Sequence, residues 1–557
     1  ASRCAWGMLT MGVFWATEVM PLAATALLPV FLFPLTSVST TKDICDAYFN
    51  QSNMLFLAGL MIAIAVEDSN LHKRIALRIV LWTGTTLRWV LLGFMCCTCF
   101  LSVWISNTAT TAMMVPIVEA VLEERIIVPR NISQDPVAVL DVDASTNDLF
   151  EKATESETIS MSEINEVSKQ PREHDKKTEK MLQNARIGCL FAVAYSANLG
   201  GTGAITSTAP NLVLMGILDN LYGKTDLNFA TWMAFNIPGM LLNLFIAWIW
   251  LQMIFIGLPL PFKRSKPTSG SSNISENDLE QIEPNTDDES KRIGAVLRQK
   301  FDALGPISFA EMTTGISFIV LIILWVLREP GFIRGWSDIF SVSVSDATPA
   351  ILIVAFLFAT PAKPDFGFCK ASGARRKPSH RKLLEWRSVH DKLAWNVIIL
   401  LGGGFAMSKA CTTSGLANWI GDTLALLSSL QPPVVLLILT TATAFMTELV
   451  SNTATAAILL PAIPDLATKL GVHPLYLMLP LTVTCSYAFM LPIATPPNAI
   501  VHAVLHSKPH IMGGTGLIMN LICILVLNLL MNCYGPLVFN LNPTGLSPIQ
   551  RNETSFT

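Results

Sequence analysis

The sequence predicts an all-α polytopic membrane protein made of two related halves, each with a re-entrant helical hairpin and a broken transmembrane helix. Three observations predict this class: the apolar composition, a polar phrase that occurs twice inside apolar segments, and an uneven distribution of Lys and Arg. Of the 557 residues, 51% are hydrophobic and 14% are charged, and the mean hydropathy is +0.49. A soluble core of this size does not need so many uninterrupted apolar runs, so several of them are expected to span a bilayer.

The polar phrase is the strongest of the three signals. SNTATTAM at 106–113 returns as SNTATAAI at 451–458, 345 residues later. Ser, Asn and Thr favour helix caps and turns, and in hydrocarbon they are costly unless they line a site. We therefore expect two helical hairpins that enter the membrane and turn back at Ser-Asn-Thr. A polar helix–helix contact would explain a single copy, but a polar break duplicated in corresponding halves indicates a transporter binding site.

A second pair of breaks follows the two hairpins. STAPN at 207–211 resembles ATPPN at 494–498, and the first of them is preceded by GGTG at 200–203. These breaks interrupt the apolar segments 187–219 and 475–505. Each half therefore reads as a span, a hairpin, a broken span and a final span.

The Lys and Arg residues indicate that the two halves are inverted relative to each other. If the basic loop 363–394 is cytoplasmic, the loops on that side hold 30 Lys and Arg and the opposite loops hold 7. The segment after the first span of each half agrees, with four Lys and Arg in 67–88 and one in 409–432. The C-terminal tail 538–557 is then extracellular, and Asn552 in Asn-Glu-Thr is a usable glycosylation site.

The sequence lacks the motifs that are typical of several other functional classes. No GxxxxGK[ST] phosphate loop occurs, which argues against an ATP-driven pump, and the eight His show no HExxH pattern. The eleven Cys have no metal-ligand spacing and read as small buried side chains. The formal charge of −3 says nothing about partners because the charges cluster in loops. We expect neither an enzyme nor a nucleic-acid-binding protein.

Inverted halves bring both Ser-Asn-Thr tips and both Pro-Asn breaks together near the middle of the bilayer. The groups available there are hydroxyls, amides, loose carbonyls and helix N-termini, without Lys or Arg in either tip. Carbonyl and hydroxyl oxygens suit Na⁺, and N–H groups with bound cations can hold an anion. The expected order is Na⁺ first and then an anion, because an anion entering an empty site would lose hydration without counter-charge.

These residues also resemble the divalent anion:sodium symporter family, in particular the animal sodium-coupled dicarboxylate and citrate cotransporters. The resemblance covers the chain except the two polar loops and rests on four motifs: NLHKRIALR (70–78), WISNTATTAMMVPI (104–117), LLGGGFAMSKA (400–410) and FMLPIATPPNAIV (489–501). It implies a homodimeric elevator-type transporter of the cell membrane, surrounded by lipid. The family has one further span at its start, which this chain is expected to lack.

The resemblance also implies a division into scaffold and transport domains. The expected segments are scaffold spans at 1–88, a transport-domain hairpin at 89–123, a disordered cytoplasmic loop at 124–186, transport domain at 187–258, a polar cytoplasmic loop at 259–310, scaffold spans at 311–432 with the basic loop 363–394, transport domain at 433–537, and the tail 538–557.

The expected ligands follow from the resemblance, residue by residue. One Na⁺ site would use Ser102, Ser106, Asn107, Gly200 and Gly201, and the other Thr447, Asn452 and Ala494. Na⁺ is co-transported rather than a prosthetic group. The substrate carboxylates would meet Asn107, Thr108, Asn452, Thr453, Thr495 and Pro496.

Two departures bear on the substrate. Some citrate-preferring relatives have Val after the second-tip Asn, where this chain has Thr453, and they have Gly-Thr-Gly-Pro in place of Ser207–Pro210. These differences favour succinate-type C4 dicarboxylates, with citrate left open. The sulfate-transporting branch has Asn-Pro-Pro where this chain has Thr495-Pro496-Pro497, so a sulfate-type symporter is a weaker alternative. A Na⁺-independent exchanger is the nearest rival. A channel would not need two polar tips that face each other, and the short outer loops disfavour a receptor.

A few single features complete the expectations. Glu448 lies in an apolar segment, so it is either part of the Na⁺ site or hydrogen-bonded to a neighbouring helix. Gly402-Gly403-Gly404 is expected to allow close helix packing. Lys73, Arg74 and Arg78 are expected to lie along the cytoplasmic interface.

Overall fold

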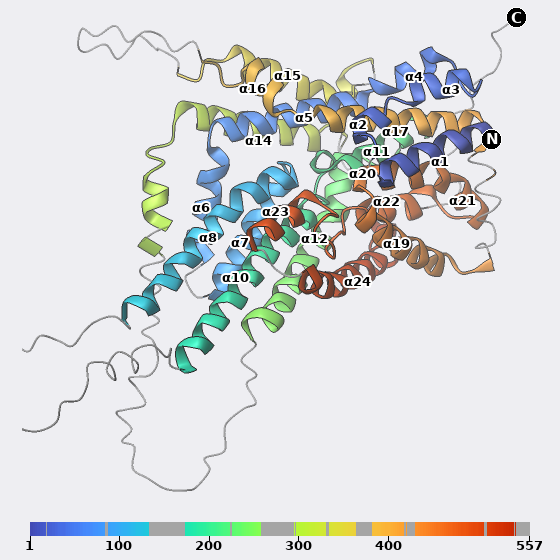
Figure 1. Ribbon diagram of the computed structural model, residues 1–557. Coiled ribbons are helices and arrows are strands. Elements are labelled where there is room, and N and C mark those ends of the chain that lie inside the picture. Colours follow the sequence, from blue (N-terminus) through green and yellow to red (C-terminus); the bar gives the residue numbers. More distant parts are fainter. Residues whose placement is uncertain are drawn as a thin grey trace, which may run out of the picture.

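A computed structural model gives the arrangement of the helices (Figure 1). It describes residues 1–17, 19–83, 87–132, 173–222, 225–257, 294–329 apart from 296, 334–363 apart from 343, 381–416, 419, 429–505, 509–539 and 541. The described part is helical, and its only β-type pairing is an isolated bridge between Pro361 and Lys382. The predicted all-α class is confirmed.

The first half contains one helical hairpin and one broken helix. Before the hairpin come α1 (Ser2–Thr17), α2 (Leu22–Thr25), α3 (Pro29–Leu35), α4 (Thr41–Tyr48), α5 (Gln51–Asp68) and α6 (Leu71–Thr83). The hairpin is α7 (Leu87–Ser102) and α8 (Asn107–Ile132). The broken helix is α10 (Glu173–Gly200), η1 (Ile205–Ser207) and α11 (Ala209–Tyr222), followed by α12 (Phe229–Leu251) and its π-helical end η2 (Gln252–Ile256).

The second half repeats this order. It begins with α14 (Phe309–Val326), η4 (Trp336–Ile339), α15 (Ala347–Ala359), α16 (Trp386–Lys392) and α17 (Trp395–Thr413). The hairpin is α19 (Pro432–Leu449) and α20 (Asn452–Leu459), continued by η7 (Leu460–Ala462) and α21 (Ile463–Leu470). The broken helix is α22 (Pro474–Thr484) and α23 (Pro496–Leu505), and α24 (Pro509–Cys533) and α25 (Gly535–Val538) end the described helices.

Side-chain caps explain where several helices begin. The carboxamide of Asn50 accepts a hydrogen bond from the amide of Asn53 at the start of α5. Asn228 and Thr231 form a reciprocal capping box at the start of α12, and Ser308 and Glu311 do the same for α14. Polar residues beside apolar runs thus fix the ends of the spans.

Five helices of the described part are long and apolar enough to cross a membrane, or six if the bent pair α16–α17 counts as one. They are α4 with α5, α12 with η2, α14, α19 and α24. The hairpin helices α7 and α8 and the half-helix α22 contain shorter apolar stretches. The chain therefore has the composition and helix lengths of a multi-pass membrane protein.

The helices form two groups that meet along α11, α17 and α20. In the first group, α5 contacts α14, α15 and α17 along one edge of the molecule (Figure 1). The second group contains both hairpins, both broken helices, α12 and α24. Contacts of α17 with α11 and α20 join the two groups.

Within the second group, each hairpin contacts broken-helix segments from both halves of the chain. In the first hairpin α7 packs on α10, while α8 also contacts α23 from the other half. In the second hairpin α19 packs on α22, while α20 contacts α11 from the first half. Each hairpin tip is therefore flanked by broken-helix segments of both halves.

The glycines of α17 allow close packing, as predicted. A Cβ atom at Gly403 would lie 2.6 Å from the carbonyl oxygen of Ala26, and one at Gly404 would lie 2.9 Å from the Cβ of Ala457 in α20. Gly402 faces the ring of Tyr48 in the same way. The run is thus a helix-packing feature, and Gly404 lies where the two helix groups touch.

Some sequence-based boundaries were wrong. Helix α8 continues to Ile132 and α10 begins at Glu173, so both ends of the loop predicted to be disordered, 124–186, are helical. The segment 173–186 is rich in Glu, Lys, Gln and Arg, which are good helix formers as well as polar residues. The basic loop 363–394 also contains the short helix α16. Asn552 lies outside the described residues.

Candidate functional site

Each Ser-Asn-Thr phrase forms a sharp break between two helices and starts the second one. The Ser106 hydroxyl oxygen accepts a hydrogen bond from the Ala109 amide at 3.3 Å, and Ser451 accepts one from Ala454 at 3.3 Å. A serine that caps a helix N-terminus satisfies one of the amides that have no partner within the helix. The repeated phrase therefore has a local structural cause, and Ser106 uses its hydroxyl as a cap.

At the first tip, three oxygen atoms converge at the junction of α7, α8 and α10. The hydroxyl oxygen of Ser102 lies 2.7 Å from Oδ1 of Asn107 and 2.8 Å from the carbonyl oxygen of Ala197. Ser102 is the last residue of α7 and Asn107 the first of α8, so the break itself brings their side chains together.

The second tip repeats this arrangement. The hydroxyl oxygen of Thr447 lies 2.8 Å from Oδ1 of Asn452 and 2.9 Å from the carbonyl oxygen of Cys485. Thr447 and Asn452 have the same spacing as Ser102 and Asn107, and Cys485 directly follows α22. The two halves thus build the same local geometry from different hydroxyl residues.

Each cluster has more hydrogen-bond acceptors than hydrogens. The side chains supply one hydroxyl hydrogen for three oxygens, both carbonyl-type oxygens are acceptors only, and the Ala197 carbonyl also accepts from the Gly201 amide at 3.1 Å. Na⁺ is a hard cation that binds oxygen ligands, and loosened backbone carbonyls at a helix break are known to coordinate it in transporters. An oxygen-rich pair of clusters is therefore chemically suited to Na⁺.

The two tip asparagines offer a free donor beside each cluster. Oδ1 of Asn107 and of Asn452 faces the cluster, whereas the Nδ2 of each donates no hydrogen bond within the described residues. Both side chains are half-buried, so their N–H groups remain accessible. One amide can therefore bridge two ligands, with its oxygen toward a cation and its N–H toward an anion.

The Thr residues that follow the asparagines differ between the tips. Thr108 is exposed, whereas Thr453 is buried. The Thr108 hydroxyl is therefore more accessible to a solute than the Thr453 hydroxyl, although the sequences of the two tips match.

Both broken helices are held open by an asparagine. Asn211 Nδ2 donates to the carbonyl oxygens of Gly201 at 3.1 Å and Ala204 at 2.9 Å. Asn498 Nδ2 donates to the carbonyl oxygens of Ala488 and Leu491, both at 3.0 Å. These are the Pro-Asn asparagines of the two predicted breaks, and they satisfy carbonyls that the unwound backbone leaves without helical partners.

Glycine is required where α10 ends against the first tip. A Cβ atom at Gly201 would lie 2.8 Å from both side-chain termini of Asn107, and one at Gly200 would lie 2.8 Å from the Cβ of Ser102. The structure thus places Gly200 and Gly201 beside Ser102 and Asn107, as the predicted site requires.

Asn198 links the two halves and was missed in the sequence. Its Nδ2 donates to the carbonyl oxygen of Ala488 at 3.1 Å and lies 3.2 Å from the hydroxyl oxygen of Thr495. Thr495 is buried by this contact, while Pro496 is exposed. Little in the sequence indicated a role for Asn198. It precedes the GGTG run by two residues, and the second half has no asparagine at the corresponding position.

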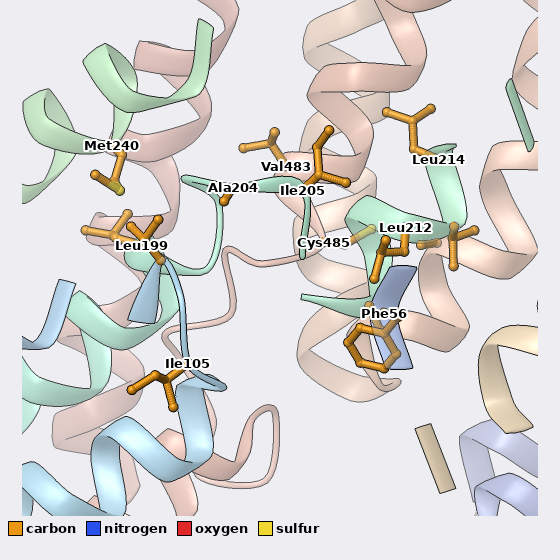
Figure 2. Close-up of a cluster of buried hydrophobic side chains, with 14 of the residues drawn as sticks. Phe56, Ile105, Leu199, Ala204, Ile205, Leu212, Leu214, Met240, Val483 and Cys485 are labelled. Atoms are coloured by element: carbon orange, nitrogen blue, oxygen red, sulfur yellow. The ribbon is translucent and has the colours of Figure 1, made fainter. Parts of the chain in front are cut away.

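Apolar side chains surround the breaks. Figure 2 shows Leu199, Ala204 and Ile205 of the first broken helix in one buried cluster with Val483 and Cys485 of the second. Hydrogen bonds and charges act more strongly in such low-dielectric surroundings than in water.

Glu448 stabilises the second break rather than the tip. Its Oε1 accepts hydrogen bonds from the amides of Phe489 at 2.8 Å and Met490 at 2.9 Å, and its Oε2 accepts one from Leu491 at 3.0 Å. Asn520 of α24 donates to the same Oε1 at 2.8 Å. One buried carboxylate thus replaces the helical partners that three consecutive amides lack.

Most of the predicted Na⁺ ligands are brought together, with two differences: Ser106 caps α8 instead of joining the cluster, and a carbonyl other than that of Ala494 reaches Thr447. Ser102, Asn107, Gly200 and Gly201 meet at the first tip, and Thr447 meets Asn452 at the second. The carbonyl that approaches Thr447 belongs to Cys485, whereas Ala494 was predicted. The amide of Ala494 donates to Leu491 inside the break. Carbonyls cannot be assigned by residue type, which is why the contributions of Ala197 and Cys485 were missed.

An all-helical chain with apolar spans and two matched polar breaks has the architecture of a membrane transporter. The profile of the family described as the sodium:sulfate symporter transmembrane region matches residues 1–541. The chain belongs to this family.

Curated relatives align over almost the whole chain. It is 42% identical to the Na⁺/citrate cotransporter of Rattus norvegicus, over 97% of this chain and 92% of the relative. It is 40% identical to the Na⁺/dicarboxylate cotransporter 3 of Mus musculus, over 99% and 93%. The crystal structure of the Alcanivorax borkumensis YdaH transporter shares the fold, with a TM-score of 0.51 and 11% identity over 95% of this chain and 98% of that one.

Proposed function

We propose that the protein is a secondary active symporter that moves di- and tricarboxylates into the cell with Na⁺. The observation that supports this most is the duplicated oxygen cluster with a free asparagine amide beside it. Relatives named for Na⁺-coupled citrate and dicarboxylate cotransport, aligned over nearly the full chain, support the same cargo. A symporter of this kind is not an enzyme, and Na⁺ is its co-substrate.

The cation sites and the anion site share the two tip asparagines. Ser102, Asn107 and the Ala197 carbonyl would bind one Na⁺, and Thr447, Asn452 and the Cys485 carbonyl the other. The bound cations then attract the carboxylates, which accept hydrogen bonds from Asn107 and Asn452, with Thr108, Thr453 and Thr495 nearby. Succinate-type C4 dicarboxylates are the favoured substrates, with citrate as a second.

The two helix groups correspond to the domains of an elevator. The group around α5, α14, α15 and α17 would be the scaffold, and the hairpins and broken helices would move against it. The inverted halves, a homodimeric assembly in the cell membrane and an extracellular C-terminus belong to the same proposal. Gly404 against Ala457 would be a contact between the moving and stationary parts.

Uptake by reconstituted vesicles tests the function. Radiolabelled succinate and citrate should accumulate with inward Na⁺ and should not accumulate when choline replaces Na⁺. Uptake should carry net positive charge inward, so an inside-negative potential should increase it. Equal uptake in choline would instead identify a Na⁺-independent exchanger, and Na⁺-driven sulfate uptake without carboxylate uptake would identify a sulfate-type symporter.

Thr447→Ala is expected to weaken Na⁺ dependence more than maximal substrate rate. It removes one of the three oxygens of the second cluster but no group proposed to contact the carboxylate. A lost contact to a charged partner costs about 1.5–3 kcal/mol, so the Na⁺ concentration for half-maximal uptake should rise about tenfold or more. The control is Thr443→Ala, since the Thr443 hydroxyl bonds to Leu439 within the same helix. Equal Na⁺ curves for both variants would remove Thr447 from the cation site.

Gly404→Val is expected to slow transport about fivefold or more while leaving Na⁺ dependence unchanged. The new side chain would collide with Ala457 across the proposed domain interface, and overpacking typically costs about 1–3 kcal/mol. Gly514→Ala in α24 is the control, because a Cβ atom there meets nothing within 4 Å. An unchanged initial rate for Gly404→Val would show that this contact does not limit domain movement.

A further inference from the structure

An apolar cavity of about 290 Å³ lies between α5, α6, α14 and the first hairpin. Its walls include Ala63 of α5, Leu71 and Ile75 of α6, Phe318 and Ile319 of α14, and Trp104 beside the tip. None of the residues that line it is charged. Apolar cavities of this kind exclude water and bind apolar groups.

The cavity opens at the side of the helix bundle. Ile319 is 57% exposed and Phe100, another wall residue, is 48% exposed. Both α5 and α14 have the length and composition of membrane spans, so the medium that meets this opening is the lipid hydrocarbon. An acyl chain is the group of the right chemistry to enter.

One face of α6 carries both residues that line this cavity and a cationic side chain. Leu71 and Ile75 line the cavity, and Arg78 and Trp82 continue the same face at helical spacing. The Arg78 guanidinium lies 5.5 Å from the ring centre of Trp82 and 5.7 Å from that of Phe301. Within the described residues Arg78 has no carboxylate partner, and its side chain is exposed.

Arg74 shows that the cations of α6 are not equivalent. Its Nε lies 3.1 Å from Oε1 of Glu311, and its Nη2 donates to the carbonyl oxygens of Leu304 and Pro306. Arg74 is therefore buried and fully paired, contrary to the expectation that it lies along the membrane interface. Arg78 remains the cation of α6 with both a free N–H edge and a place beside the cavity.

We propose that this cavity binds an anionic phospholipid of the cytoplasmic leaflet. One acyl chain fills the cavity, and the phosphate binds Arg78 with Trp82 at the interface. Arginine binds phosphate through two N–H groups, and exposed Trp favours the headgroup region. Helix α6 turns away from the end of α5 (Figure 1). It lies in the segment 67–88, which the Lys and Arg distribution assigns to the cytoplasmic side.

Lipid at this position would act on the first tip. Trp104 and Ile105 line the cavity and directly precede Ser106 and Asn107. Trp104 also makes an edge-to-face contact with Phe318, with ring centres 5.2 Å apart. The lipid therefore bridges α14 and the hairpin, so its occupancy should change the transport rate. This second part rests on the proposed function, whereas the binding itself does not.

Lipid retention tests the binding directly. The purified protein is exchanged into zwitterionic detergent-lipid micelles with a trace of phosphatidylglycerol, and bound lipid is counted by native mass spectrometry. The wild-type protein should retain phosphatidylglycerol over phosphatidylcholine. Arg78→Gln should lower that retention about fivefold, since one cation near an anionic headgroup is worth about a factor of five. Lys73→Gln is the matched control, because Lys73 is exposed on the opposite face of α6.

A second variant tests the chain-binding cavity. Ile319→Trp fills the cavity mouth from an exposed position, so the fold should tolerate it, and it should reduce retention of both lipids. Equal retention by wild type, Arg78→Gln and Lys73→Gln would overturn the headgroup site. Unchanged retention by Ile319→Trp, or a second copy of the chain at the cavity in place of lipid, would overturn the chain site.

Uptake in vesicles with and without phosphatidylglycerol then tests the functional part. The wild-type and Lys73→Gln proteins should respond to the anionic lipid, and Arg78→Gln should not. If no protein transports carboxylate in either vesicle, the proposed function fails while the retention result stands. If all transport equally in both vesicles, the lipid does not act on the tip.

Discussion

Replacing either Asn107 or Asn452 with alanine is expected to abolish Na⁺-dependent carboxylate uptake while leaving surface expression near normal. Each substitution removes an Oδ1 that lies within 2.8 Å of a hydroxyl in the oxygen cluster and an Nδ2 that is free to donate. Loss of one contact to a charged group costs about 1.5–3 kcal/mol. Because one side chain serves both the cation and the anion, the two losses combine and should exceed a hundredfold.

The control is Asn50→Ala, which removes a helix N-cap of α5 outside the site. It should cost about 1 kcal/mol of stability and leave the Na⁺ and substrate concentrations for half-maximal uptake unchanged. Asn107→Asp and Asn452→Asp add a further distinction, since they keep the oxygen but place a negative charge where the carboxylate binds. They should keep Na⁺ binding and lose substrate binding. Normal uptake by either alanine variant would make the tips packing motifs.

Glu448→Ala is expected to abolish transport and to destabilise the protein. The carboxylate accepts from the amides of Phe489, Met490 and Leu491, and these amides have no helical partners in the break. Leaving a buried donor unsatisfied costs about 1–3 kcal/mol for each group, so thermal unfolding should shift to a clearly lower temperature. The break would rearrange, and with it Thr495 and the Ala488 carbonyl.

Glu448→Gln removes the negative charge of the side chain but nearly preserves its shape. Its amide oxygen can still accept from Phe489 and Met490, but its NH₂ group would face the amide of Leu491. We expect reduced transport and an intermediate melting temperature, with Glu385→Gln as the control for the same chemical change, because the half-exposed Glu385 precedes α16 and lies away from the break. Parental uptake and stability in Glu448→Ala would show that the break holds without the carboxylate.

The repeated polar phrases made the hairpins and breaks predictable, because Ser, Asn and Pro act locally. Ser106 and Ser451 cap helices through bonds within three residues, and Asn211 and Asn498 bind carbonyls seven and ten residues away. Such contacts depend on short-range geometry that recurs wherever the phrase recurs. The helix ends near the tips were accordingly placed well.

The missed features are those that depend on tertiary packing. The carbonyls of Ala197 and Cys485 reach the clusters because of how α10 and α22 pack on α7 and α19, and any residue type could supply them. Asn198 has no repeat partner, so duplication could not reveal it. Arg74 looked like an interfacial cation because its partner Glu311 is 237 residues away.

Equilibrium binding of radiolabelled succinate to the purified protein, with Na⁺ varied against choline at constant ionic strength, tests the central claim most directly. The claim is that two oxygen clusters load Na⁺ and thereby create the anion site. The account predicts no saturable binding in choline, and an affinity that rises steeply with Na⁺ and shows a Hill coefficient above one. Thr447→Ala should shift that curve to higher Na⁺. Saturable succinate binding of the same affinity in choline would contradict the account.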